Sequence, residues 1–235
     1  MAVADRNRLE QEALLQLNKG SLEGALNAYL QILKMDPKDR RVRQKVGELY
    51  LKLNKGQEAQ KYLKEVAEGL IKEGNHRAAV SVLKQMISVT PEDPALQMDL
   101  GECYLGAGYP NDARNCFDQS MRLYIGLLLP ARAAKAARKL AELSPGEPSI
   151  KLKVAELLEQ GNDATGALEI YQEVMAEFRR RGRADEVGRV AELALKLKPE
   201  DMNLVLDAAS ARVDGGEWKK ALAHLQNAFK VAPSD

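Results

Sequence analysis

Two pairs of glutamates stand at a spacing that could support acid–base chemistry. Glu65 and Glu68 are three residues apart, and so are Glu156 and Glu159. On a helix this spacing puts both carboxylates on one face, where their repulsion can raise one pKa. Any charged, solvent-exposed helix supplies such pairs, and the sequence offers no catalytic residue to accompany them. We therefore interpret both pairs as solvated helix surface.

The cysteines and histidines form no metal or redox motif. The spacings of Cys103, Cys116, His76 and His224 match neither CxxC nor HxxxH. Phosphate-binding loops, nucleophile elbows, zincin motifs and EF-hand loops are also absent from the sequence. We expect reduced, buried thiols, no metal, no cofactor and no enzymatic activity.

Composition narrows the class of protein. Of the 235 residues 45% are hydrophobic, and 35 basic side chains against 34 acidic ones give a net charge of +1. This apolar content is enough for a folded core, and the charge is far from that of a dedicated nucleic-acid binder. No segment reaches the roughly 18 apolar residues of a membrane span, and the N-terminus lacks the apolar core of a signal peptide. We expect a cytoplasmic protein without membrane insertion.

The elements that must position these residues are helices. Apolar residues recur at spacings of three and four, as in Val46, Leu49 and Leu53, while alternating β-branched runs are nearly absent. Glycines and prolines bound helical segments of about 12 to 17 residues. Prolines that close such segments recur every 54 residues, at Pro37, Pro91, Pro145 and Pro199. The sequence therefore predicts an all-α chain with a 54-residue repeat.

Small and large residues recur in register with these prolines. The clearest copy is Leu100, Gly101 and Tyr104, followed by Ala113 and Phe117. Other copies share parts of this pattern: Val46, Gly47, Tyr50, Ala59 and Leu63; Ala25, Tyr29 and Pro37; Ala79, Leu83 and Pro91; and Ala221, Leu225 and Pro233. The pattern resembles the tetratricopeptide repeat. The resemblance covers nearly the whole chain and implies an α-solenoid of about 13 helices that forms a right-handed superhelix.

The 54-residue period departs from the family's usual period of about 34 residues. The closing proline of a motif that begins at Arg40 would fall on Ile71, and the equivalent positions hold Ile125 and Arg179. Without a proline, the second helix can continue and serve as the first helix of the next motif, so that two motifs overlap by about 14 residues. We expect one solenoid over residues 1–235, part of a longer array, with a helix pair in 1–39, three-helix units in 40–93, 94–147 and 148–201, and a helix pair in 202–235.

One corner of the repeat departs from its copies. Leu127, Leu128 and Leu129 align with residues 73–75 and 181–183, which are charged or polar apart from glycine. Because such a corner faces water, the leucines predict an exposed apolar patch that binds a partner, with Pro130 and Arg132 beside it and further basic residues on the following helix. Alternatively, the leucines extend the helix and pack on the next unit. The sequence alone leaves both possibilities open.

The resemblance implies a second candidate surface, because the first helix of each motif lines the inner face in this family. Position by position, it selects Gln44, Glu48, Lys52, Met98, Glu102, Leu105, Leu152, Glu156 and Glu159. Mixed charge with scattered apolar residues is typical of a surface that binds a peptide or protein. An ordinary solvated face is the alternative.

Helical-repeat arrays leave long surfaces free to hold other macromolecules. We therefore interpret the chain as a scaffold or adaptor for a peptide segment or a globular partner, such as a small signalling GTPase or an assembly component. The alternative is RNA binding, which requires a basic inner face. Glu48, Glu102 and Glu156 at one aligned position argue against RNA, while a cluster favours it: Arg179, Arg180, Arg181 and Arg183. We expect a protein or peptide partner and no nucleic acid.

Overall fold

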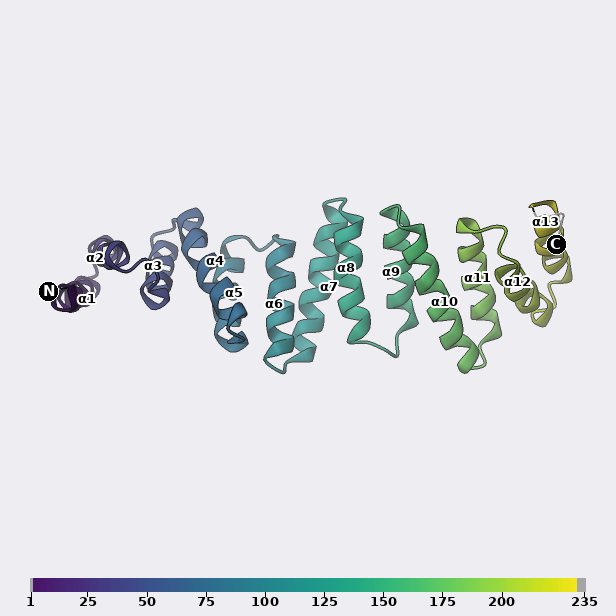
Figure 1. The fold of residues 1–235 in the computed structure, drawn as a ribbon, viewed down its shortest axis with the longest axis horizontal. Coiled ribbons are helices and arrows are strands. Elements are labelled where there is room, and N and C mark those ends of the chain that lie inside the picture. Colours follow the sequence, from purple (N-terminus) through teal and green to yellow (C-terminus); the bar gives the residue numbers. More distant parts are fainter. Residues whose placement is uncertain (1, 232–235) are drawn as a thin grey trace. The chain divides into compact units, whose positions relative to one another are not determined.

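The described part of the chain is entirely helical. The computed structural model describes residues 2–231, which contain thirteen α-helices and no strand (Figure 1). This confirms the predicted all-α solenoid. The right-handed superhelix stays a prediction, and Pro233 of the last sequence copy lies outside the described residues.

Helix boundaries follow the 54-residue period. The first helices of the repeat are α3 (Arg40–Lys52), α6 (Pro94–Gly106), α9 (Pro148–Gln160) and α12 (Met202–Asp214). The middle helices are α1 (Ala2–Asn18), α4 (Gly56–Lys72), α7 (Pro110–Gly126), α10 (Ala164–Arg180) and α13 (Trp218–Val231). The third helices are α2 (Leu22–Met35), α5 (His76–Val89), α8 (Pro130–Glu142) and α11 (Ala184–Leu197). Within each class, every helix begins 54 residues after the one before it.

The middle helices are unbroken where the family would place a closing proline. Each of α4, α7 and α10 has 17 residues and includes the equivalent position, which is Ile71, Ile125 or Arg179. The first helices have only 13 residues. The middle helix is therefore one continuous element that can serve two overlapping motifs, as the period requires.

Local chemistry explains where the first helices begin. Asp39, Asp93 and Asp201 each follow a closing proline by two residues, and their carboxylates accept hydrogen bonds from backbone N–H groups at the starts of α3, α6 and α12. Such N-caps satisfy donors that have no partner within the helix. The spacing from proline to aspartate thus ends one unit and starts the next.

The chain divides into two compact units, Met1–Cys116 and Phe117–Asp235, with the boundary inside α7. Buried aliphatic and small side chains form the core of each unit. The predicted grouping into one solenoid with three-helix units stays a prediction.

Helices alternate between two layers within each unit. In the first unit, α4 lines one groove together with α2 and another together with α6. On the other layer, Gln85 of α5 donates a hydrogen bond to Glu48 of α3 at 3.4 Å. In the second unit, Arg179 of α10 pairs with Asp207 of α12, and His224 of α13 lies 3.1 Å from Glu192 of α11. Every second helix therefore shares a layer.

Candidate functional site

The glutamates that were considered for acid–base chemistry form ordinary ion pairs and hydrogen bonds. Glu65 pairs with Arg43, Glu156 lies 2.8 Å from Lys153, and Glu159 accepts a hydrogen bond from the Tyr171 hydroxyl. Among residues 2–231 no group of three His, Cys, Asp or Glu side chains could hold a metal ion. The absence of enzymatic activity stays a prediction.

Both cysteines are free and buried. Burial is the main cause that raises the pKa of each thiol to about 11, with smaller contributions from nearby carboxylates. Since the thiolate is the reactive form, neither cysteine is a candidate nucleophile.

The α4–α6 groove is a recess of the first unit. It is lined by residues of α4, α5 and α6 and has a volume of about 520 Å³. Its floor is apolar: Ala67, Ile71, Leu83, Met86 and Leu96. Recesses of roughly 300–1,000 Å³ with an apolar lining are typical ligand sites. The groove can therefore take apolar side chains of a partner.

Charged side chains of opposite sign stand on the two walls of the α4–α6 groove. Lys61 and Lys64 line it from α4, and Asp93 and Asp99 line it from the α6 side. Lys64 lies 3.9 Å from Glu68, while Asp93 caps α6. Glu68 also lines the groove from α4, so the α4 wall carries two positive charges and one negative charge, while the α6 wall carries two negative charges. This difference can orient a bound segment.

The predicted inner-face residues of the first unit lie on helices of both layers. Gln44, Glu48 and Lys52 lie on α3, in the layer of α5. Met98, Glu102 and Leu105 lie on α6, in the layer of α4, and Met98 is buried. The second unit holds Leu152, Glu156 and Glu159 on α9. The binding role of all nine residues stays a prediction.

The apolar corner, defined as residues 127–129, is exposed. The exposed fractions of Leu127, Leu128 and Leu129 are 56%, 85% and 38%. The helix α7 ends at Gly126, so the leucines neither extend it nor lie in the core. Of the two possibilities that the sequence left open, the structure has the exposed patch. Its role in binding stays a prediction.

The backbone at the apolar corner has the same hydrogen bonds as the aligned corner at residues 181–183. Leu128 N–H donates to the Ile125 carbonyl and Leu129 N–H to the Tyr124 carbonyl, both at 3.0 Å. Gly182 and Arg183 make the same two bonds, also at 3.0 Å, to Arg179 and Phe178. These bonds close the C-terminal end of a helix around a left-handed residue.

Leu128 is an unusual residue for that left-handed position. Its φ is +56°, and the other two non-glycine residues with positive φ in the described chain are Asn54 and Asn162. Asparagine tolerates this region, whereas a leucine there costs about 1–2 kcal/mol. The aligned corners use Gly74 and Gly182. The protein thus keeps a strained leucine at a position where its side chain is almost fully exposed.

Basic side chains follow the apolar corner along α8. Arg132, Lys135 and Arg138 recur at intervals of three, which puts them on one side of the helix, and all three are exposed. None of them forms an ion pair with another described residue, whereas Lys139 lies 3.6 Å from Glu142. The opposite side of α8 is a buried row of alanines. The corner therefore combines exposed leucines with unneutralised positive charge.

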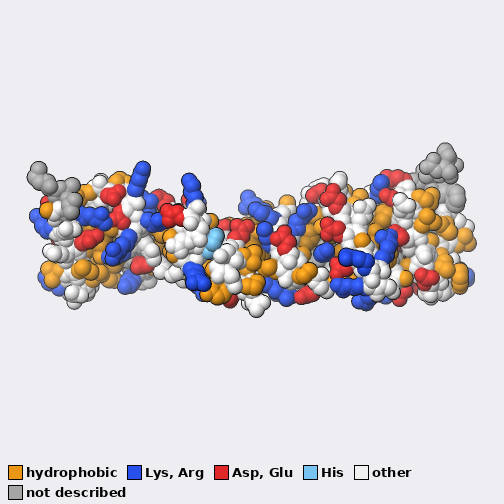
Figure 2. Space-filling model, turned by 60° about the horizontal axis from the view of Figure 1, so that its bottom comes forward, with side chains coloured by type: hydrophobic (Ala, Val, Ile, Leu, Met, Phe, Trp, Pro, Cys, Tyr) orange, Lys and Arg blue, Asp and Glu red, His pale blue; other side chains and the backbone are white. Residues whose placement is uncertain are grey.

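The predicted basic cluster of the RNA alternative is largely neutralised. Arg179 pairs with Asp207, Arg181 with Glu177 and Arg183 with Glu186. On the face shown in Figure 2, basic and acidic side chains are interspersed. Neither observation provides the basic surface that phosphate binding requires.

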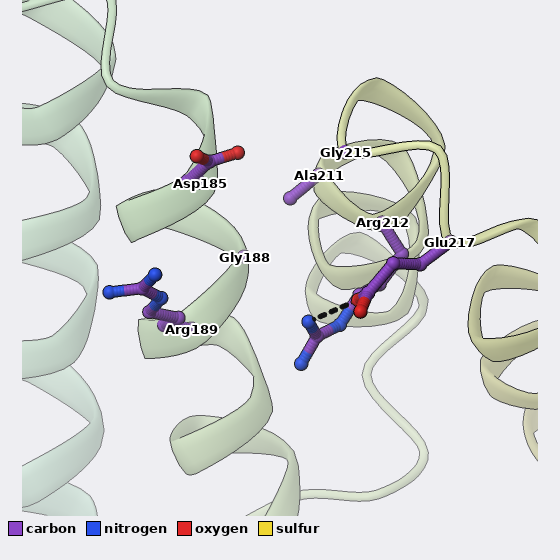
Figure 3. A pocket seen from close by; sticks show the side chains of 7 residues that line it. All are labelled: Asp185, Gly188, Arg189, Ala211, Arg212, Gly215 and Glu217. Carbon is purple, nitrogen blue, oxygen red and sulfur yellow. Dashed lines mark hydrogen bonds and ion pairs between the residues drawn. The ribbon is translucent and has the colours of Figure 1, made fainter.

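A small pocket lies where α11 and α12 pack closely against each other. It has a volume of about 190 Å³ (Figure 3). The Arg212 guanidinium there donates two hydrogen bonds of 2.7 Å to Glu192 and one of 2.5 Å to Glu217. A Cβ on Gly188 would lie 2.1 Å from that of Ala211, so the helices need glycine to approach this closely. Because the Arg212 guanidinium already binds Glu192 and Glu217, we assign no ligand to this pocket.

None of the helices in the described residues combines the length and apolarity needed to cross a bilayer. The cytoplasmic location stays a prediction.

Several solved structures are similar to this chain over most of its length. The MamA protein is 14% identical over 96% of this chain and 91% of that chain, with a TM-score of 0.22. BtubC (BKLC) from P. vanneervenii is 15% identical over 95% and 90%, with a TM-score of 0.41. The human IFIT1 dimer with PPP-AAAA is 16% identical over 89% and 59%, with a TM-score of 0.31. All three TM-scores are below 0.5, so these likenesses carry no argument about this chain.

Family models give the more specific result. No curated protein matches the chain in sequence. Two models, each described as tetratricopeptide repeat, match residues 11–69 and 70–122. The matches meet at the end of α4, the first middle helix for which the sequence predicts two overlapping motifs. Residues 11–122 of the chain therefore belong to the tetratricopeptide repeat family.

Proposed function

We propose that the chain is a protein-interaction scaffold that holds a peptide segment of a partner in the α4–α6 groove. Tetratricopeptide repeats are in general protein-interaction scaffolds. The observation that carries the proposal is the groove itself, with an apolar floor and a volume of about 520 Å³. An apolar recess of this size favours binding over solvation when a partner supplies matching side chains.

The walls of the groove indicate the chemistry of the segment. Apolar side chains of the segment would lie over Leu83 and Met86, which form part of the floor. A carboxylate on one side of the segment would face Lys61 and Lys64, and a basic residue on the other side would face Asp99. A small signalling GTPase or an assembly component remains the predicted source of such a segment.

A substitution that fills the groove without touching the core tests this function. Ala95 is exposed at the start of α6 and lines the groove, so Ala95→Trp would place a large side chain at its edge. Ser149 is the matched control, because it is exposed at the same position of α9, 54 residues later, and lines none of the described pockets.

The measurement is affinity capture with the wild-type chain, Ala95→Trp and Ser149→Trp, followed by mass spectrometry, with and without nuclease. We expect protein partners that resist nuclease, disappear with Ala95→Trp and persist with Ser149→Trp. Capture that depends on intact RNA would support the nucleic-acid alternative. Partners retained equally by all three proteins would exclude the groove.

A further inference from the structure

We propose that the apolar corner docks on the surface of an anionic lipid bilayer. This interaction is independent of the peptide groove, which lies in the other unit of the chain. It concerns the tip of a helical hairpin and requires no membrane-spanning segment.

The first support is the shape and position of the leucines. Leu127 and Leu128 are more than half exposed and follow the last residue of α7, and Leu129 leads into α8. Three successive aliphatic side chains therefore stand at the turn of a hairpin, and no described pocket includes any of them. A projecting apolar tip can enter the boundary between headgroups and acyl chains, which lies about 5–10 Å deep for interfacial elements.

The second support is charge. Arg132, Lys135 and Arg138 are exposed and have no ion-pair partner among the described residues. At a rise of about 1.5 Å per residue, they extend over about 9 Å of α8 behind the tip. This span is about one Debye length of roughly 8 Å, so Arg132, the nearest to the tip, would feel an anionic surface most strongly and Arg138 least once the tip has entered it.

Acidic groups near the tip are already engaged. The neighbouring α9–α10 turn approaches the start of α8, since a Cβ on Gly161 would lie 3.6 Å from the Ala131 nitrogen. The carboxylates closest to Gly161 in the chain, Glu159 and Asp163, accept hydrogen bonds from the Tyr171 hydroxyl and the Gly166 N–H and keep their charge. On α7, Asp118 lies 2.8 Å from Arg122. The three basic side chains of α8 therefore outnumber the two carboxylates of this turn.

The composition favours a bilayer over a protein partner. Sites of strong protein–protein binding are enriched in Trp, Tyr and Arg and depleted in Leu. The corner offers aliphatic side chains and no aromatic one on its surface, because Tyr124 beneath it is buried. A short apolar anchor combined with a basic patch supplies the two signals that reversible membrane attachment needs. A second copy of this chain would bring the same positive charges together, which disfavours self-association through the corner.

Vesicle flotation tests the proposal with purified protein. The probes are vesicles of phosphatidylcholine alone and vesicles with roughly 30% phosphatidylserine, the kind of anionic lipid that attracts basic segments. We expect wild-type protein to float only with the anionic vesicles, and less so as salt is raised. Leu127→Glu with Leu128→Glu, and separately Arg132→Glu with Lys135→Glu, should each reduce binding at least about tenfold.

Two further variants control for folding and for general charge. Leu128→Gly installs the residue of the aligned corners and removes only the exposed side chain, so it should weaken binding while retaining helicity. Arg181→Glu with Arg183→Glu changes the same amount of charge at the aligned corner and should leave binding unchanged.

Three results would overturn the proposal. The first is a wild-type chain that fails to float with anionic vesicles. The second is binding that the leucine variants do not reduce. The third is a leucine-dependent dimer, or a leucine-dependent protein complex, without leucine-dependent vesicle binding.

Discussion

Two corners of the second unit share a backbone and differ in their surface. At the α7–α8 corner the chain presents Leu127, Leu128 and Leu129, and at the α10–α11 corner it presents Arg181, Gly182 and Arg183. The two corner hydrogen bonds have the same length, 3.0 Å, in both. The repeat therefore fixes the turn, while the side chains on the turn remain free to differ. A surface can be changed from charged to apolar without altering the helices that carry it.

The arginine corner, residues 181–183, satisfies its own charges. Arg181 pairs with Glu177, Arg183 pairs with Glu186, and the Arg183 guanidinium lies 5.7 Å from the Phe178 ring centroid. The apolar corner has no such internal partners, and its left-handed residue is a leucine. The arginine corner therefore satisfies its charges within the chain, whereas the role of the apolar corner in binding stays a proposal.

The largest expected effect on stability comes from removing the buried aromatic ring that lies beneath each corner. Tyr124 and Phe178 occupy aligned positions, and each is 7% exposed beneath its corner. Tyr124→Ala and Phe178→Ala should each lower the free energy of unfolding by about 3 kcal/mol, because both remove a buried aromatic ring. Urea denaturation followed by circular dichroism measures this. A loss below about 1 kcal/mol at only one site would show that the two supports are not equivalent.

A smaller effect is expected when the arginine corner is given a leucine. Gly182 has a φ of +68°, and a Cβ there would meet no atom within 4 Å, so only backbone strain opposes a side chain. Gly182→Leu should lower the free energy of unfolding by about 1 kcal/mol. Gly182→Asn is the matched control and should be closer to neutral, because Asn54 and Asn162 already adopt positive φ in this protein. Equal losses for both variants would contradict this explanation.

A still smaller effect on stability is expected from charging the apolar corner. Leu127→Glu with Leu129→Glu should change the free energy of unfolding by no more than about 0.5 kcal/mol, as is usual at exposed positions, while binding to anionic vesicles weakens. Thermal melting and helicity from circular dichroism check the first part. A large drop in melting temperature would mean that these leucines support the core.

The smallest effect is expected at Arg183. Its ion pair with Glu186 is exposed, with 53% of the arginine side chain accessible. Arg183→Ala should cost only about 0.5 kcal/mol, and added salt should reduce that cost further. Denaturation at low and high salt gives the difference. A cost above about 2 kcal/mol would indicate that the cation–π contact with Phe178 matters more than its exposure suggests.

The sequence predicted the order of the helices because the residues that end and start helices act locally. Pro37 and Pro91, each followed two residues later by a capping aspartate, mark the end of one helix and the start of the next whatever the tertiary packing. The continuous middle helix also followed from a local fact, the absence of proline at Ile71 and its equivalents. The polar residues at the aligned corners indicated that the leucines could be exposed, but the sequence left open whether they pack on the next unit instead.

Placement of the inner face could not be predicted in the same way. It depends on the layer in which a helix lies, and that depends on counting helices rather than residues. The family rule assigns Glu48 and Glu102 to one face, but an odd number of helices in each repeat puts α3 and α6 in different layers. The α4–α6 groove was missed for this reason. Counting helices along the chain would have placed α4 and α6 in the same layer, where they line this groove.

The backbone strain at Leu128 could have been predicted by aligning the repeats, because the equivalent residues are Gly74 and Gly182. Both glycines adopt a left-handed backbone that leucine disfavours. The most direct measurement is therefore the free energy of unfolding of Leu128→Gly against the wild-type chain in urea. Relief of backbone strain at a side chain that contacts little should raise stability by roughly 0.5 to 1 kcal/mol. A loss of about 1 kcal/mol or more would show that Leu128 is held by packing, and the interpretation of this corner as a surface kept for a partner would be wrong.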